Sequence, residues 1–181
     1  EPKPEVLPLT FTNVSFASVN NFVEEGTPIN YSIEDIINIM VQATKECKMN
    51  LNSQWYLLDK LINHNRVGKY ASTLKLTVPR IVCKTAIVFE SQFKNTISKM
   101  NLKENQYGFS KVIEALYGES CIVICMSQQE YVEAVRKFSN LQQANKLPAP
   151  HEVTIDTKVE RKPEAKTKTA ELAEELMQGE N

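Results

Sequence analysis

The sequence predicts a mixed α+β domain, and three local patterns support this prediction. Cys121–Met126 is apolar throughout, as expected for a central strand that is covered on both faces. From Ile33 onward, apolar residues recur at the three- and four-residue spacing of a helix. Ser127 and Glu130 stand at the two positions of a capping box, and the apolar stripe behind them indicates a helix packed against a core.

The predicted strands and helices occupy residues 9–147, which we interpret as a single α/β domain. Strands are expected at Leu9–Phe16, Thr73–Val78, Ile81–Phe89 and Cys121–Met126, with Pro79 interrupting the second and third. Helices are expected from Ile33 to about Lys48, from Asn52 or Ser53 to near Gly68, over Gln92–Met100, over Phe109–Tyr117 up to Gly118, and from Ser127 to before Leu147. The apolar stripe of the last helix consists of Tyr131, Ala134, Val135, Phe138 and Leu141.

The two ends of the chain differ from the domain in composition. Residues 1–8 contain three prolines and predict an extended arm. Residues 148–181 are interpreted as a linker followed by an acidic amphipathic tail helix, and the segment after Pro150 is expected to lie outside the core. Leu172, Leu176 and Met177 would share one side of that helix and could bind a partner, although a solubilising extension without a partner fits the same composition.

Composition places the protein among ordinary globular domains. Hydrophobic residues make up 42% of the chain and charged residues 24%, which excludes the charge-rich profile of a disordered protein. No apolar run is long enough to predict a membrane span. The four cysteines lie in apolar segments, so we expect buried thiols in a reducing compartment instead of disulfides. The chain begins at Glu1 without a secretory signal, and we expect that a preceding segment, such as an organelle import sequence, has been removed.

The sequence gives no sign of an enzyme, a metal site or a cofactor site. His64 and His151 have no cysteine or carboxylate at a metal-ligand spacing. The five glycines are isolated from one another, whereas phosphate-binding loops need clustered glycines before a helix. We therefore expect no catalytic residue, no metal and no cofactor, although triads that are assembled only in space can escape sequence analysis.

The strongest functional signal is a basic run over residues 60–103, which holds nine basic residues and a single acidic one, Glu90. If these side chains share one face, they would neutralise phosphates and give salt-dependent binding of nucleic acid. Arg80, Lys84, Lys94 and Lys99 are the residues that we expect to contact phosphate. The alternative is a solvated, lysine-rich surface with no ligand.

The order of features over residues 84–140, about a third of the chain, resembles the ribosomal stalk-base protein family, the tenth protein of the large subunit and its relatives. The pieces that carry the resemblance are the strand Thr85–Phe89, Phe93-Lys94-Asn95-Thr96-Ile97, the helix Phe109–Tyr117, Gly118, the strand Cys121–Met126 and the helix Ser127–Phe138. In this chain Val67–Arg80 intervenes with a strand of its own, where that family continues directly from a helix.

The resemblance implies a ferredoxin-like α/β sandwich that docks on ribosomal RNA beside a neighbouring stalk-base protein, with Asn95 added to the RNA-binding residues. It also implies that the tail helix carries acidic stalk protein dimers. Together with the trimmed start, it suggests a divergent mitochondrial member in the mitochondrial matrix, with the cytoplasm as the alternative. The competing hypothesis is a protein-interaction scaffold or coat-like assembly subunit that needs no nucleic acid.

Overall fold

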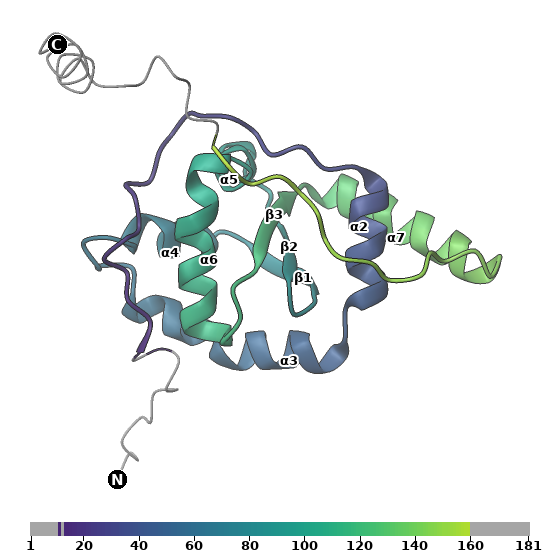
Figure 1. The fold of residues 1–181 in the computed structure, drawn as a ribbon, viewed down its shortest axis with the longest axis horizontal. Coiled ribbons are helices and arrows are strands. Elements are labelled where there is room, and N and C mark those ends of the chain that lie inside the picture. The colour runs from purple at the N-terminus through teal and green to yellow at the C-terminus, as the bar shows by residue number, and fades with distance from the viewer. Residues whose placement is uncertain (1–10, 12, 160–181) are drawn as a thin grey trace, which may run out of the picture.

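A three-stranded sheet lies at the centre of the computed structural model, which describes residues 11 and 13–159 (Figure 1). Strand β2 (Ala86–Glu90) is central, with β1 (Val78–Val82) antiparallel on one side and β3 (Ile122–Met126) parallel on the other. Helices cover both faces of the sheet, so the α+β prediction is confirmed. The arm predicted over residues 1–8 and the tail helix with Leu172, Leu176 and Met177 lie outside the described residues.

The first two strands form a hairpin, which corrects two predictions. Ile81–Phe89 is not one strand, because Cys83–Thr85 makes the turn between β1 and β2. Thr73–Val78 is not a strand either: its first residues end a helix, and β1 begins at Val78. Pro79 lies inside β1, where the pairing register shifts between Pro79 and Ile81. A proline is tolerated there because β1 is an edge strand with an irregular register.

The predicted first long helix consists of two helices with a break between them. Helix α2 (Ile33–Gln42) begins as expected, with a capping box between Ser32 and Asp35. It ends before Lys48 because Ala43 is extended, and Thr44 then caps α3 (Lys45–Gln54) by accepting the Cys47 N–H.

The predicted second helix is also wrong in extent. The chain continues from α3 into the 3₁₀ helix η1 (Trp55–Lys60), and after a loop α4 (Gly68–Leu74) begins at the glycine that was expected to end a helix. A side chain at Gly68 would meet the Ile62 carbonyl oxygen at 2.6 Å, so the close approach of two backbone segments explains this glycine.

Two helices connect β2 to β3, as the sequence predicts. They are α5 (Lys94–Met100) and α6 (Lys103–Tyr117), and α6 begins earlier than the predicted Phe109. Gly118 ends α6 in the left-handed conformation, with φ of 86°. The strand Cys121–Met126 is confirmed as β3 and is buried, but it is an edge strand and not the central one. Side-chain amides from Asn101 and Gln106, not another strand, hydrogen-bond to its outer edge.

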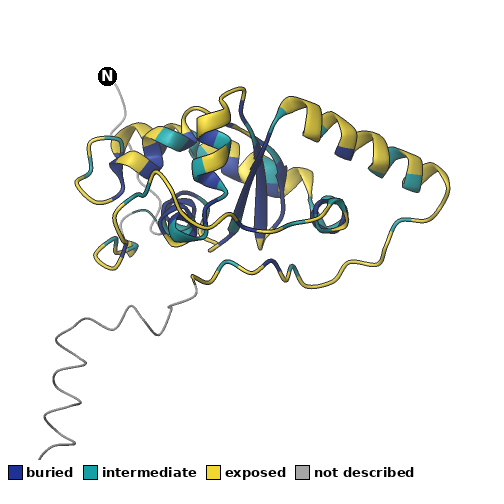
Figure 2. Ribbon diagram, turned by 90° about the horizontal axis from the view of Figure 1, so that it is seen from above, coloured by how far each residue is buried: buried dark blue, intermediate teal, exposed yellow. Residues whose placement is uncertain are grey.

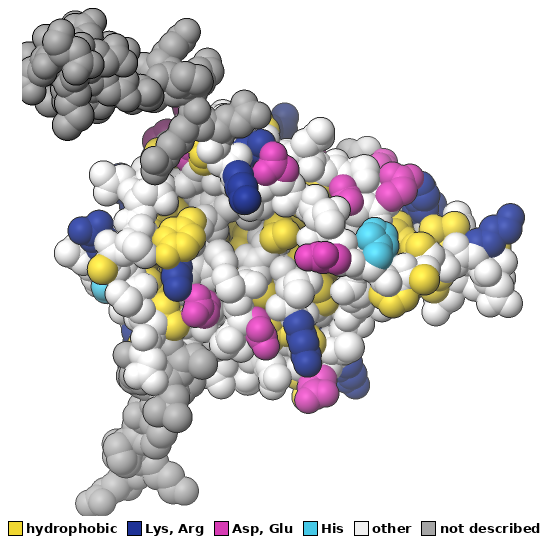
Figure 3. Space-filling model, viewed as in Figure 1, with side chains coloured by type: hydrophobic (Ala, Val, Ile, Leu, Met, Phe, Trp, Pro, Cys, Tyr) yellow, Lys and Arg dark blue, Asp and Glu magenta, His cyan; other side chains and the backbone are white. Residues whose placement is uncertain are grey.

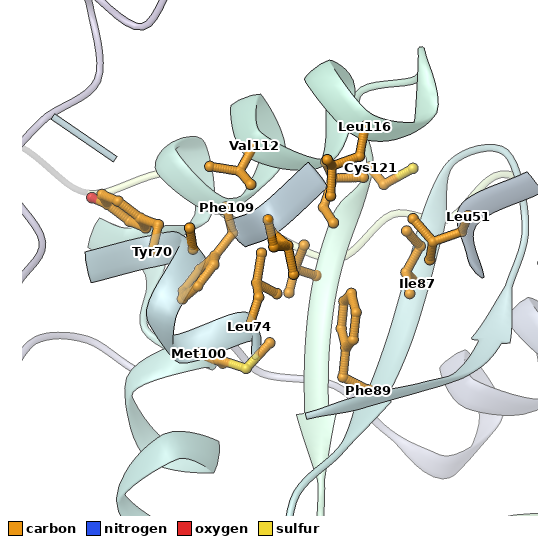
Figure 4. Packing of buried hydrophobic residues seen from close by; sticks show 14 of the residues in the cluster. Leu51, Tyr70, Leu74, Ile87, Phe89, Met100, Phe109, Val112, Leu116 and Cys121 are labelled. Atoms are coloured by element: carbon orange, nitrogen blue, oxygen red, sulfur yellow. The ribbon is translucent and has the colours of Figure 1, made fainter. Parts of the chain in front are cut away.

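The core has two parts, one on each face of the sheet. The larger part packs α3, η1, α4 and α6 against one face, and Tyr70 and Phe109 stack edge to face within it at 5.1 Å (Figure 4). The smaller part packs α2, Ala134 and Ile155 against the other face.

The chain before α2 packs along α6 in an extended form. Of the strand predicted at Leu9–Phe16, the described residues 11 and 13–16 form no strand, so that prediction is wrong for this part. Further on, Val23 exchanges two hydrogen bonds with the Asn105 side-chain amide, at 2.9 Å each. Tyr70 donates its hydroxyl to the Asn20 carbonyl at 2.9 Å, which fixes this segment on the core.

The chain after Pro150 returns to the domain as an extended strap, residues 151–157, which corrects the expectation that it lies outside the core. Asn38 exchanges two hydrogen bonds with the backbone of His151, and Ile155 is only 7% exposed. Val153 and Ile155 alternate as in a strand, a local pattern that the acidic composition of the whole segment concealed.

Helix α7 (Gln128–Gln143) projects from the body of the domain, and most of its residues are exposed (Figure 2). Ser127 caps it as predicted, by accepting the Glu130 N–H. Among the described residues, no helix has the length and apolar character required to cross a bilayer.

Candidate functional site

The five predicted RNA-binding residues lie on β1, on the turn before β2 and on α5. Arg80 donates to Glu90 at 2.9 Å, and its guanidinium lies over the Tyr131 ring. Lys99 is paired with Glu24 at 2.6 Å. Both cations are therefore partly neutralised within the domain.

The other three predicted residues are exposed but lie at opposite ends of β2. Lys84 lies in the turn before this strand, whereas Lys94 and Asn95 lie in the first turn of α5 after it. A five-residue strand separates them by about 17 Å. They would contact separate parts of a large ligand.

The rest of the basic run is also partly balanced by carboxylates from outside it. Lys75 is paired with Asp59, and Lys103 with Asp156 at 3.3 Å. Asp59 lies in η1 and Asp156 lies in the strap. The excess of positive charge along residues 60–103 is therefore larger than the excess on the surface.

Two common surfaces for RNA recognition are not formed by the described residues. An RNA-binding sheet needs an open face on which bases stack, and here helices cover both faces of the three strands. A backbone-clamping loop needs two glycines three residues apart, and the sequence contains no such pair.

The buried thiols and the two histidines are held within the domain by packing and by the backbone. Burial raises the pKa of the Cys121 thiol far above its usual range and that of Cys125 to about 12, so both thiols stay protonated at neutral pH. His64 accepts backbone N–H groups through Nδ1, and His151 lies in the strap. Within the part of the chain that the structure describes, no three His, Cys, Asp or Glu side chains are placed to hold a metal ion.

A groove of about 320 Å³ lies between α7, β1 and the junction of α2 with α3, and we call it the α7 groove. Its apolar lining comes from Met40, Ala43, Ile81, Val82, Tyr131 and Phe138. Its cations are Lys45, Lys48 and Arg80. The groove thus combines an apolar floor with a basic rim.

Helix α7 exposes apolar side chains on more than one side. Only Ala134 is buried, whereas Val132 and Val135 are 44% and 38% exposed. Hydrophobic side chains are also visible on the projecting arm formed by α7 and the chain that returns from it (Figure 3). Asn145 permits that return by adopting a φ of 55°.

Comparisons with protein-family models, curated proteins and solved structures find no match.

The apolar stripe of α7 is visible in the sequence, but its exposure is not. The pattern Tyr131, Ala134, Val135, Phe138 and Leu141 predicted a helix packed on the core, and only Ala134 is buried. The one signal that could have indicated exposure is Val132, an apolar residue on another side of the same helix. Lys45 and Lys48 lie before residue 60, so the charge count over the basic run does not include them.

Proposed function

We propose that this protein is an assembly or scaffold subunit whose α7 groove binds an apolar segment of a partner protein that is flanked by acidic residues. The observation that carries the proposal is that Tyr131 and Phe138, which line the groove from α7, stay half-buried and that Val135, one turn from each, is 38% exposed, on a helix that keeps only Ala134 buried. An isolated helix of this length is marginal in water, so its stability would increase if a partner covered its apolar side.

The apolar floor of the groove supplies the driving force for such binding. Burial of apolar surface is worth about 25 cal/mol per Å², and Tyr131 and Phe138 are half-buried side chains that a partner could cover further. Aromatic side chains of this kind are enriched at the energetic centres of protein interfaces.

The basic rim indicates which partner fits. Lys45 and Lys48 flank the groove, and no carboxylate contributes to its lining. Arg80 adds a third cation, although Glu90 neutralises part of its charge. Complementary charges around an apolar centre speed association and select the partner, so acidic residues are expected beside the apolar anchor.

Site-specific photocrosslinking in the native cell tests the proposal. A photoreactive side chain at Val135 should give one protein adduct of defined mass that survives nuclease treatment. The adduct should disappear when Lys45 and Lys48 are both changed to Glu. The matched control is the same crosslinker at Tyr56, which is exposed but lies on η1, away from the groove. No discrete adduct at Val135, or an adduct with RNA alone, would contradict the proposal.

A second candidate function is that of a structural constituent of the large ribosomal subunit at the stalk base. The observation that favours it is the exposure of Lys84 and Lys94, for which the described residues provide no carboxylate partner. This candidate includes the ferredoxin-like sandwich, a neighbouring stalk-base protein, a tail helix that carries acidic stalk dimers, and a mitochondrial location.

Sedimentation of a native lysate distinguishes the two candidates. A ribosomal constituent would travel with a large particle and leave it after nuclease treatment, and changing both Lys84 and Lys94 to Glu would release it. A subunit bound through the α7 groove would keep its protein partner after the same treatment.

A further inference from the structure

A second groove, on a different part of the molecule, brings together basic side chains that lie apart in the sequence. It has a volume of about 750 Å³ and lies between the segment before α2, the loop after η1, α4 and α5. Arg66, Lys69 and Lys99 line it, together with His64 and Glu24. We call it the cationic groove, and it shares no lining residue with the α7 groove.

Glu24 shows where an anion is held in this groove. Its carboxylate is bound to Lys99 at 2.6 Å, although its side chain remains 62% exposed. The hydrogen bond from Lys99 lowers the pKa of Glu24, and the charge of Lys69 adds to the effect. Two cations from different helices therefore converge on one exposed carboxylate, which a ligand anion could replace.

On the other side of the cationic groove, hydrogen bonds to backbone groups hold the side chains of His64 and Arg66 in place. His64 Nδ1 accepts the N–H groups of Arg66 and Val67 at 3.0 and 3.3 Å, so its single proton is on Nε2 when the ring is neutral. Arg66 donates from Nη1 to the Val19 carbonyl at 3.4 Å, which anchors one end of the guanidinium and leaves its other N–H groups to a ligand.

Neutral polar side chains fill the space between these charges. They are Asn21, Asn63, Asn65, Ser72 and Thr73. Three cations separated by amides and hydroxyls match a ligand with several spaced negative charges better than a single compact anion. A positively charged groove that follows a backbone is the arrangement used for single-stranded nucleic acids.

We propose that the cationic groove binds the phosphodiester backbone of single-stranded nucleic acid through Arg66, Lys69 and Lys99, and that Glu24 competes with the phosphates for the same cations. This site is separate from the proposed protein-binding site, so either proposal can fail alone. Of the residues expected to bind RNA from the sequence, it includes only Lys99.

Fluorescence anisotropy with a short labelled polyuridine strand tests this site on the full chain. We expect the Lys69→Glu variant to bind about tenfold more weakly, whereas Glu24→Gln should bind several-fold more tightly because it removes the competing anion. With three phosphates neutralised, the logarithm of the binding constant should fall with the logarithm of salt concentration with a slope of about −2. Lys69→Glu should make that slope shallower.

Two controls make the result specific. Lys146→Glu changes an exposed lysine beyond the end of α7 and should leave binding unchanged apart from a small effect of net charge. Urea midpoints equal to that of the parent chain show that the Lys69 and Glu24 variants remain folded, since both side chains are exposed. Inorganic phosphate and polyglutamate, at matched ionic strength, should displace the strand poorly.

The proposal is overturned if Lys69→Glu binds as well as Lys146→Glu, or if Glu24→Gln fails to bind more tightly than the parent chain. Equal displacement by polyglutamate would show a general polyanion surface and would also overturn it. If Lys84→Glu and Lys94→Glu weaken binding while Lys69→Glu does not, the nucleic acid contacts the surface of the ribosomal candidate instead.

Discussion

The side-chain amide of Gln106 binds both backbone groups of Val123. Gln106 Nε2 donates to the Val123 carbonyl at 2.8 Å, and the Val123 N–H donates to Gln106 Oε1 at 3.2 Å. Asn101 makes the same pair of bonds with Cys125, both at 2.8 Å. The backbone N–H and carbonyl groups of Val123 and Cys125 face away from β2, and the side chains of Gln106 and Asn101 supply their hydrogen-bond partners. These buried backbone groups are therefore satisfied without a fourth strand.

Replacing Gln106 with Ala should destabilise the domain by about 3 kcal/mol, because the N–H and carbonyl groups of Val123 would be buried without partners. Urea unfolding measures the free-energy change. The matched control is Gln142→Ala on the exposed side of α7, which should stay within about 0.5 kcal/mol of the parent chain. A cost below about 1 kcal/mol for Gln106→Ala would show that water replaces the amide.

Gly108→Ala should destabilise the domain by about 2–4 kcal/mol, because the added methyl group would overlap the Tyr70 ring. That ring is fully buried and packs edge to face on Phe22 and Phe109, so it cannot move aside. Thermal or urea unfolding measures the cost. In a Tyr70→Ala background the same glycine substitution should be much less harmful, and an equal cost in both backgrounds would refute the steric explanation.

Ile155→Ala should destabilise the domain by about 2–3 kcal/mol, because it empties space between the strap and the sheet face that α2 covers. The control is Val159→Ala, since Val159 is 48% exposed and its truncation should have little effect. Both variants are compared by urea unfolding at neutral pH. Equal small effects would mean that the strap contributes nothing to the stability of the core.

The free energy of unfolding should fall as pH rises from about 9 to about 12. Burial raises the pKa of Cys125 from 9.0 to about 12 and that of Tyr70 from 10.0 to about 12. In this range the unfolded chain releases protons that the folded state retains, so each group contributes stability below its unfolded pKa and loses it as pH approaches its folded pKa. The slope reaches at most about 1.4 kcal/mol per pH unit for each group.

Urea unfolding at several pH values through this alkaline range checks the prediction. Cys125→Ala removes one of these titrations, and its unfolding free energy should fall less steeply with pH than that of the parent chain. If the parent chain shows no pH dependence in this range, the two groups are not protected from ionisation as their burial indicates.

Sequence patterns predicted the elements with strong local signals and failed where contacts between distant segments decide the structure. The cap at Ser32, the glycine stop at Gly118 and the apolar run of β3 are local, and each is confirmed. The hairpin turn over Cys83–Thr85 has no glycine or asparagine to indicate it. In the sequence Gly68 has the appearance of a helix stop. In the structure it begins α4, and a side chain there would collide with the Ile62 carbonyl of the preceding loop.

The candidate surfaces were less accessible to sequence analysis than the fold. The basic run was a real feature, but its partners Glu24, Asp59 and Asp156 come from outside it, and only the fold brings them together. Likewise, nothing in the spacing of Arg66, Lys69 and Lys99 shows that a loop and two helices place them around one groove. Surface charge depends on distances between side chains, which a linear count does not contain.

The paired amides also close one edge of the sheet. Asn101 and Gln106 occupy the N–H and carbonyl groups of Val123 and Cys125 on the outer side of β3, so a strand from another molecule finds no free backbone groups at these two residues. On the opposite edge, the Val82 carbonyl of β1 accepts the Thr44 N–H, and Pro79 has no N–H to donate. The two amides that complete the core therefore also guard β3 against strand addition, the route by which exposed sheet edges aggregate.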